Sequence, residues 1–341
     1  MLLFICAMVI LISCTLTRYM IYYAQSHQII DQPNYRSLHT VAVPRGAGIA
    51  VIFSVVWALP FIHCAFGTLP AGSISLILIT AVVTLIGFLD DCWNLSSALR
   101  FAIYAVVCTG ILYSLGGMPV IYLLHFNPHV AWMMQIIGWI YLLWMVNLYN
   151  FMDGINGLAA SEAICVCIGG VCLYLATGHS DAIYIPLIVA AASLGFLVWN
   201  FPVARIFMGD SGSCSLGLIL AGLSIQAGRL MPELFWAWLI LLGVFIVDGT
   251  YTVLCRALQG LKIYQAHRSH AYQHAAARFG HARVTFIVIL INLIWLFPVS
   301  ALVGLKYLDP ILGIILAYIP LTLIAFRLNA GRLVHLNKII D

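Results

Sequence analysis

Two long apolar segments of the 341-residue chain are separated by the stretch Asn200-Phe-Pro-Val-Ala-Arg-Ile-Phe-Met-Gly-Asp-Ser-Gly-Ser213. The stretch carries one base, Arg205, one aromatic side chain, Phe207, and one acid, Asp210, which stands between glycines. An acid at this position can cap the next helix. It can also hold a divalent cation beside backbone N–H groups that suit phosphate. The stretch by itself leaves both interpretations open.

The composition indicates a membrane protein. Hydrophobic residues make up 64% of the chain, charged residues only 8%, and the mean hydropathy is +1.07. Charges are costly in a bilayer core, so we expect a protein that crosses the membrane many times. The ten cysteines include no C-x-x-C pair, which favours packing over disulfides or metal binding. The N-terminus lacks a basic region and a cleavage site, so we expect the first apolar run to be retained as a span.

Apolar runs of about 17–23 residues predict eleven spanning helices. We place them at residues 1–22, 46–66, 71–89, 98–116, 131–149, 158–177, 182–200, 213–229, 233–255, 284–305 and 310–327. No internal repeat or low-complexity segment is evident. We therefore expect a single all-α, polytopic transmembrane domain over residues 1–341, with polar motif loops at about 24–45, 90–97, 150–157, 200–212 and 257–283.

Basic residues are concentrated on one face of this predicted topology. The other face has only Arg229 and Lys306, and the remaining thirteen of fifteen are Arg18, Arg36, Arg45, Arg100, Arg205, Arg256, Lys262, Arg268, Arg278, Arg283, Arg327, Arg332 and Lys338. Cytoplasmic loops carry an excess of Lys and Arg, so we expect this face to be cytoplasmic. An odd number of spans then places the N-terminus outside and the C-terminus in the cytoplasm.

Most of the acids lie on the same face as these bases. Asp90 and Asp91 end the third apolar run, and adjacent carboxylates repel each other. They indicate a metal–phosphate site or a proton acceptor, with a solvated helix end as the alternative. In the first loop, Arg36, His39 and Arg45 offer donors for phosphate oxygens, although an ordinary basic loop has the same composition.

A dense polar cluster separates the fifth and sixth apolar runs. It contains Asn150, Asp153 and Asn156 within the segment Asn-Phe-Met-Asp-Gly-Ile-Asn-Gly. Amide donors and acceptors of this kind can bind a nucleobase, a ribose or a sugar. Asp-Gly and Asn-Gly pairs also mark turns, so a plain turn between helices is the alternative.

The loop after the ninth run is rich in histidine and basic residues. His267, His270 and His274 would share one face if the segment is helical. A zinc site is less favoured because no Cys or acid joins them. We interpret the loop as a basic surface opposite a diphosphate, with an amphipathic segment on the membrane surface as the alternative.

Five polar motifs thus open on one membrane face, whereas chance would scatter them over both. Phosphoryl transfer at the bilayer surface uses carboxylates for Mg²⁺, bases for phosphates and apolar walls for a lipid. The main alternative is a transporter, which would place charges near the midplane and often contains repeats. Only Asp248, inside the ninth run, fits that alternative.

The motifs and their order resemble the polyprenyl-phosphate N-acetylhexosamine-1-phosphate transferases of glycosyltransferase family 4, over nearly the whole chain. The stretch Phe-Met-Gly-Asp-Ser-Gly-Ser at 207–213 is the most specific match. The resemblance implies an enzyme of the bacterial inner membrane with a periplasmic N-terminus. It would transfer a sugar-1-phosphate from a UDP-N-acetyl amino sugar to undecaprenyl phosphate and release UMP. No nucleic acid is expected as a partner, and the sequence leaves open whether the protein forms a homodimer.

The same resemblance implies roles for individual residues. Asp90, Asp91 and Asp210 would be catalytic, with Mg²⁺, or Mn²⁺ in its place, held by Asp210 and Asp91. Asp90 would act as a base or position the lipid phosphate. The substrate-binding set would be Asn150, Asp153, Asn156, Arg205, Phe207, His267, Arg268, His270, Arg36 and His39.

The sequence departs from the family pattern at two places. Asn156 stands where many members have a second Asp, and the segment from His267 to Gln273 keeps only one of three histidines, with Tyr272 among the replacements. Such a loop resembles the branch that initiates O antigen, in lipopolysaccharide biosynthesis, whose donors are 6-deoxy amino sugars such as UDP-N-acetylfucosamine or UDP-N-acetylquinovosamine. It argues against a pentapeptide donor.

Overall fold

The structure of the protein, a computed structural model, describes residues 1–33, 41–67, 69–119, 131–262 and 267–332. The described chain is almost entirely helical. Its α-helices are α1 (Leu2–Ser26), α2 (Gly48–Phe66), α3 (Ser73–Trp93), α4 (Ser97–Ser114), α5 (Ala131–Met152), α6 (Leu158–Ala176), α7 (Tyr184–Asn200), α8 (Asp210–Leu230), α9 (Pro232–Leu241), α10 (Gly243–Leu258), α11 (Ala271–Phe279), α12 (His281–Ile291), α13 (Phe297–Gly304) and α14 (Pro310–Arg327). The remaining elements are a 3-10 turn, η2 (Ser180–Ala182), a π-helical turn, η3 (Asn292–Leu296), and the antiparallel strands β1 (Ile30–Asp31) and β2 (Val43–Pro44).

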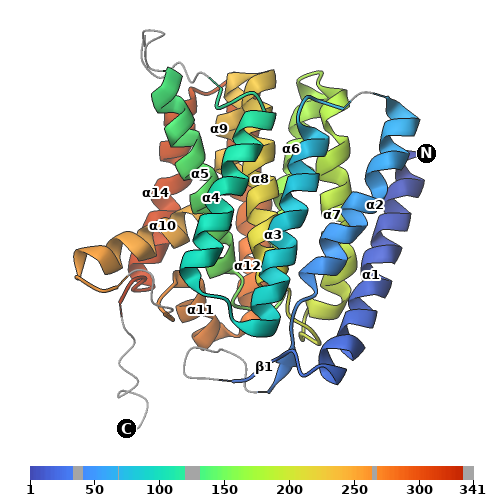
Figure 1. The fold of residues 1–341 in the computed structure, drawn as a ribbon. Helices are drawn as coiled ribbons and strands as arrows, with labels where there is room; N and C mark the ends of the chain where they lie inside the picture. Colours follow the sequence, from blue (N-terminus) through green and yellow to red (C-terminus); the bar gives the residue numbers. More distant parts are fainter. Residues whose placement is uncertain (34–40, 68, 120–130, 263–266, 333–341) are drawn as a thin grey trace.

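The predicted all-α architecture with about eleven spans is confirmed. In the described residues, ten helical segments are long and apolar enough to cross a membrane, and α9 with α10 form an eleventh, broken span. The prediction of a continuous helix at 233–255 was wrong, because α9 and α10 meet at 70°. The Tyr318 hydroxyl donates to the Leu239 carbonyl (2.8 Å), one turn before the break, and satisfies a backbone group there. α10 then runs sideways out of the bundle, at the left of Figure 1.

The spans alternate in direction, so the connecting loops gather at two ends of the bundle (Figure 1). α1 begins toward the upper end of the view, whereas α14 ends lower in the view, near α11. The two bases assigned to the outer face both lie among helix ends at the end of the bundle opposite the start of α8. Arg229 donates to the Gly116 carbonyl (2.7 Å), and the Lys306 ammonium lies 3.3 Å from the Glu233 carboxylate.

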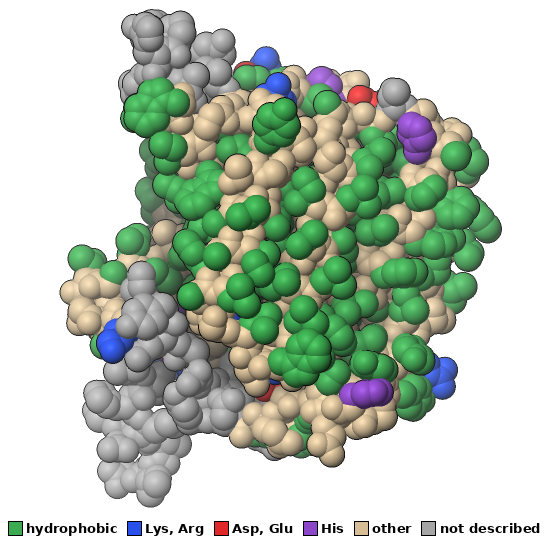
Figure 2. All heavy atoms as spheres, viewed as in Figure 1, with side chains coloured by type: hydrophobic (Ala, Val, Ile, Leu, Met, Phe, Trp, Pro, Cys, Tyr) green, Lys and Arg blue, Asp and Glu red, His purple; other side chains and the backbone are tan. Residues whose placement is uncertain are grey.

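The flank of the bundle is apolar. Figure 2 shows hydrophobic side chains over the middle of the visible face, with charged side chains near its upper and lower ends. Large apolar side chains such as Val106 and Tyr113 are exposed on this flank rather than buried. A surface of this kind is stable only against an apolar solvent, so it is the face that contacts lipid.

The central helix is α8, which follows the stretch 200–213. Every residue from Ser211 to Gly228 is buried, whereas most of α1 and α14 is not. Small residues on α8 allow this packing: Gly217 lies against the backbone of Met145, and Gly222 lies against Leu76. The first turn of α8 is therefore enclosed by several helices at the lower end of the bundle.

Two glycines let neighbouring helices approach the start of α8. A Cβ at Gly48 of α2 would collide with the backbone of Gly212. A Cβ at Gly87 of α3 would lie 2.5 Å from the Ser211 nitrogen and 2.6 Å from the Asp210 carbonyl carbon. Because backbone atoms cannot move aside cheaply, both positions require glycine.

Replacing Gly87 with Ala is expected to destabilise the protein by about 1–3 kcal/mol, as overpacking does elsewhere. The matched control is Gly110→Ala in α4, where the nearest atom to the new Cβ is 3.8 Å away. That change should leave stability unchanged or raise it by up to about 1 kcal/mol. Thermal unfolding in detergent measures both, and equal melting temperatures for the two variants would contradict the packing described at the start of α8.

Candidate active site

Two aspartates that are distant in sequence contact the guanidinium group of the same arginine. Asp90 lies near the end of α3, Asp210 is the first residue of α8, and Arg100 lies in the first turn of α4. One guanidinium nitrogen of Arg100, Nη1, donates to Oδ2 of Asp90 (2.6 Å) and also to Oδ2 of Asp210. The three side chains are between 14% and 25% exposed, so the cluster is enclosed but reachable from water. The two carboxylates thus face a shared position that already suits positive charge.

Asp91 faces the start of α8 instead. Its carboxylate accepts hydrogen bonds from the backbone N–H groups of Asp210 (3.2 Å) and Ser211 (3.4 Å). Gly209 has φ +74° and no Cβ, which leaves the room that the Asp91 carboxylate fills. Arg45 donates to the Asp91 carbonyl (2.7 Å), and its Nε lies 3.9 Å from the carboxylate. Negative charge is stabilised at a helix N-terminus, so this buried carboxylate anchors α8 and aims Asp210.

The cluster between α5 and α6 joins the same region. The Ser213 hydroxyl donates to the side-chain oxygen of Asn150 (2.9 Å), which ties the end of α5 to α8. Loss of hydration raises the pKa of Asp153 well above its usual range, and the charges of Asp210 and Asp91 raise that pKa further. Asp153 is therefore close enough to Asp210 and Asp91 for their charges to oppose its ionisation.

Asn156 holds loops together. Its side-chain nitrogen donates to the Pro202 carbonyl (3.1 Å), and its own carbonyl accepts from the Thr285 hydroxyl of α12 (2.8 Å). The neighbouring Gly157 N–H donates to the Asn200 side chain (2.7 Å). These contacts give Asn156 an architectural function between the α5–α6 loop and the stretch after α7.

The two other residues singled out in the opening stretch lie in different surroundings. The exposed guanidinium of Arg205 stacks over the Trp199 ring at 5.5 Å. Phe207 is half-buried; its N–H donates to the Pro44 carbonyl (2.8 Å), and its carbonyl accepts from Ala47 (3.2 Å). The stretch is thus hydrogen-bonded through its backbone to the segment before α2. A plain turn between two helices would not make these contacts.

The histidine loop differs from the predicted helical face. α11 begins at Ala271, so His267 and His270 precede the helix and only His274 lies within it. The rings of His267 and His270 stack with centroids 5.0 Å apart, while Nδ1 of His274 donates to the Leu328 carbonyl (2.6 Å). Within the described ranges, no group of three or more His, Cys, Asp or Glu side chains is placed to hold a metal ion.

His267 is held in its neutral form. Partial burial, followed by the nearby His270 and Arg256, lowers the pKa of His267 to about 3. A neutral imidazole at pH 7 can donate or accept a hydrogen bond but adds no charge to the loop. Arg268, which is half-buried beside it, is the permanent cation of this segment. Arg36 and His39 fall in residues 34–40, outside the described residues.

Two residues with central contacts, Arg100 and Asp248, were not selected as site residues from the sequence, and Arg45 was selected only as a donor to phosphate oxygens in the first loop. Arg100 did give a signal, because a base in the first turn of a helix opposes the helix dipole. A residue in such an unfavourable place needs a nearby anion, and the anions come from α3 and α8. Asp248 gave a signal too, as an acid within an apolar run.

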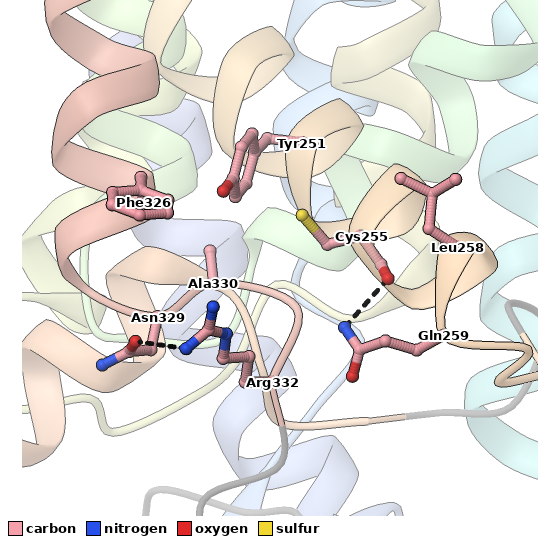
Figure 3. A pocket seen from close by; sticks show the side chains of 8 residues that line it. All are labelled: Tyr251, Cys255, Leu258, Gln259, Phe326, Asn329, Ala330 and Arg332. Atoms are coloured by element: carbon pink, nitrogen blue, oxygen red, sulfur yellow. Dashed lines mark hydrogen bonds between the residues drawn. The ribbon is translucent and has the colours of Figure 1, made fainter.

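A pocket of about 210 Å³ lies between the C-terminal ends of α10 and α14 (Figure 3). Tyr251 and Phe326 face each other across it, and Arg332 lies beside Asn329. The described residues that line the pocket include none of the predicted site residues. The candidate site is therefore the aspartate cluster rather than this pocket.

Known proteins match both the motif region and most of the chain. Residues 73–228, from the start of α3 nearly to the end of α8, match a family model described as glycosyl transferase family 4. A Bacillus subtilis protein named as a probable undecaprenyl-phosphate N-acetylglucosaminyl 1-phosphate transferase is 29% identical, covering 80% of this chain and 76% of its own length. A Mycobacterium tuberculosis decaprenyl-phosphate N-acetylglucosaminephosphotransferase is 29% identical over 76% of this chain and 72% of its own. A Geobacillus thermodenitrificans phospho-N-acetylmuramoyl-pentapeptide-transferase is 28% identical over 62% and 68%.

The apolar spans define a multi-span membrane protein, and the matched family and relatives make it a transferase. The matched region contains Asp90, Asp91, Asp153 and Asp210. Residues 73–228 match glycosyl transferase family 4, and the comparisons confirm the resemblance to the polyprenyl-phosphate N-acetylhexosamine-1-phosphate transferases.

Proposed function

We propose that the protein transfers an N-acetyl amino sugar-1-phosphate from a UDP-sugar to undecaprenyl phosphate. The products are undecaprenyl-diphospho-sugar and UMP. The relatives named for undecaprenyl- and decaprenyl-phosphate sugar-phosphate transfer support this class of reaction. The observation that carries the proposal is the convergence of Asp90 and Asp210 on one cation position, at the end of the bundle that also holds the histidine loop.

The residues present fit a magnesium ion. Mg²⁺ in phosphoryl-transfer enzymes is bound by one or two carboxylates, with substrate phosphates and waters as its other ligands. Asp90 and Asp210 offer two carboxylate oxygens as metal ligands, and both carboxylates already form ion pairs with Arg100. Asp91 is less suited to be the second ligand, since its carboxylate accepts from the first amides of α8. When bound, Mg²⁺ or Mn²⁺ supplies charge that offsets the repulsion between two phosphate-bearing substrates.

Asp90 has a positioning function in this proposal rather than a basic one. A lipid phosphate is largely ionised at neutral pH, because its second pKa is about 6. Its oxygen needs no base, but it must be aimed at the donor diphosphate. Asp153, Asn150 and Phe207 form the nucleotide side, and Arg268 with His270 contacts the diphosphate or sugar phosphate of the donor.

For the donor and pathway, we propose the branch that initiates O antigen or a related cell-envelope glycan, with UDP-N-acetylfucosamine or UDP-N-acetylquinovosamine as donor. The support is the His267–Gln273 segment, which has one histidine where a three-histidine motif is common in the family. The protein would act in the bacterial inner membrane with a periplasmic N-terminus and a cytoplasmic C-terminus. The excess of Lys and Arg at the site end supports this orientation.

Purified protein in detergent, given undecaprenyl phosphate, Mg²⁺ and a panel of UDP-amino sugars, should release UMP with at least one donor. EDTA should abolish the release, and Mg²⁺ or Mn²⁺ in excess over EDTA should restore it. A preference for the 6-deoxy donors over UDP-N-acetylglucosamine supports the proposed branch, and the reverse preference contradicts it. If UMP release stays at the wild-type rate in EDTA, the metal assignment is wrong.

A matched vesicle experiment separates transfer from transport. Reconstituted protein should release UMP outside sealed vesicles without any flux of the UDP-sugar into their lumen. Flux without UMP release would contradict the enzyme proposal.

A further inference from the structure

Asp248 is a buried acid that the proposed chemistry does not use. It lies in α10, beyond the 70° break from α9, and only 6% of its surface is exposed. Oδ1 accepts from the Ala271 N–H (2.9 Å) and Oδ2 accepts from the Tyr272 N–H (2.9 Å). The Thr252 hydroxyl, one turn along α10, also donates to Oδ1 (3.1 Å). The carboxylate therefore binds the first two amides of α11 and is itself held in place.

The same carboxylate faces a predicted substrate-binding histidine. Nδ1 of His270 lies 3.4 Å from Oδ1 of Asp248, within ion-pair distance, and makes no hydrogen bond of good geometry within the described part of the chain. A carboxylate beside Nδ1 favours the proton on that nitrogen. With the proton on Nδ1, Nε2 is a hydrogen-bond acceptor, which suits a hydroxyl or N–H group of a ligand. The His270 ring also stacks against His267, so its orientation affects both histidines.

The start of α11 connects the histidine loop to the nucleotide side. The Tyr272 hydroxyl donates to the Phe151 carbonyl (2.8 Å), and the same hydroxyl lies where a Cβ on Gly154 would be. Phe151 and Gly154 belong to the segment around Asp153. A single carboxylate on α10 thus sets the position of a helix start that contacts both parts of the donor site.

We propose that Asp248 is a positioning residue for the sugar-nucleotide donor. It fixes the orientation and tautomer of His270, and it holds the start of α11 against the loop that carries Asp153. The inference rests on the proposed function, because the donor is the ligand that these two segments would share. The acceptor lipid is expected to depend far less on Asp248, since none of the contacts of Asp248 reaches Asp90.

Steady-state kinetics of UMP release test this inference in the full-length protein. Asp248→Asn keeps the shape and removes the charge, and we expect kcat/KM for the donor to fall by about tenfold or more. The KM for undecaprenyl phosphate should stay within about twofold of wild type. A purely structural defect would lower the active fraction and leave both KM values unchanged.

A double-mutant cycle shows whether Asp248 acts through His270. His270→Gln alone should lower donor kcat/KM, and adding Asp248→Asn to it should cost clearly less than Asp248→Asn costs in the wild-type protein. The matched control is Asp309→Asn, which changes a carboxylate that caps α14 through the N–H groups of Ile311 and Leu312. That variant should keep wild-type kinetics.

If Asp248→Asn does not fold, Thr252→Val gives a milder test. It removes one donor to Asp248 and should raise the donor KM by about two- to fivefold, with no change for the lipid. Equal effects on both substrates, or multiplicative losses in the double mutant, would overturn the inference. A wild-type protein that releases no UMP with any donor would instead defeat the proposed function.

Discussion

Asp210→Asn should lower kcat by about 10³-fold, equivalent to about 4 kcal/mol of barrier, while the protein still folds. Asp210 is the one acid that both opens α8 and shares a cation position with Asp90. Asparagine retains the size of the side chain but removes the charge that would hold a metal between two anionic substrates. UMP release from purified variants measures the loss, and thermal unfolding in detergent checks that the fold is intact.

Substitutions of two other aspartates serve as controls for Asp210→Asn. Asp181→Asn, in the exposed turn η2, should keep wild-type activity. Asp91→Asn should mainly lower the melting temperature, because the Asp91 carboxylate anchors the start of α8. Full turnover by Asp210→Asn would show that the metal assignment is incorrect.

Arg100→Gln has the second-largest expected effect, a loss of about 10²-fold in activity. Without the guanidinium, Asp90 and Asp210 face each other with no compensating charge, which should also destabilise the protein by about 3 kcal/mol. Mg²⁺ should then raise the melting temperature of this variant more than that of wild type, because the ion can replace the missing charge. Arg100→Lys, which keeps the charge but loses the planar guanidinium, should be intermediate.

The control for Arg100 is another ion pair in the same chain. Lys306 and Glu233 lie 3.3 Å apart at the opposite end, and the Lys306 side chain is 60% exposed. Surface pairs contribute about 0–1 kcal/mol, so Lys306→Gln should change neither stability nor activity measurably. If Arg100→Gln behaves like this control, with no added response to Mg²⁺, the two carboxylates do not form the proposed site.

Sequence reasoning was most effective where the bilayer dictates the answer. Long apolar runs and few charges determined the class of fold. The sequence also assigned successive loops to alternate faces of the membrane, and the loops of the structure gather at two ends of the bundle. The break between α9 and α10 was not predicted, since a bent span and a straight span bury the same apolar residues. In the structure, the Tyr318 hydroxyl donates to the Leu239 carbonyl, one turn before the break at Leu242.

The sequence by itself determined which acids are concentrated at one membrane face, because hydropathy orders the chain in one dimension across the bilayer. Tertiary structure decided what each acid does there. Asp90 and Asp91 are adjacent in sequence, yet one faces Arg100 and the other caps α8, because successive side chains on a helix point in different directions. Likewise, Asp248 was a solitary charge in the sequence, and only the packing of α10 against α11 brought it to His270.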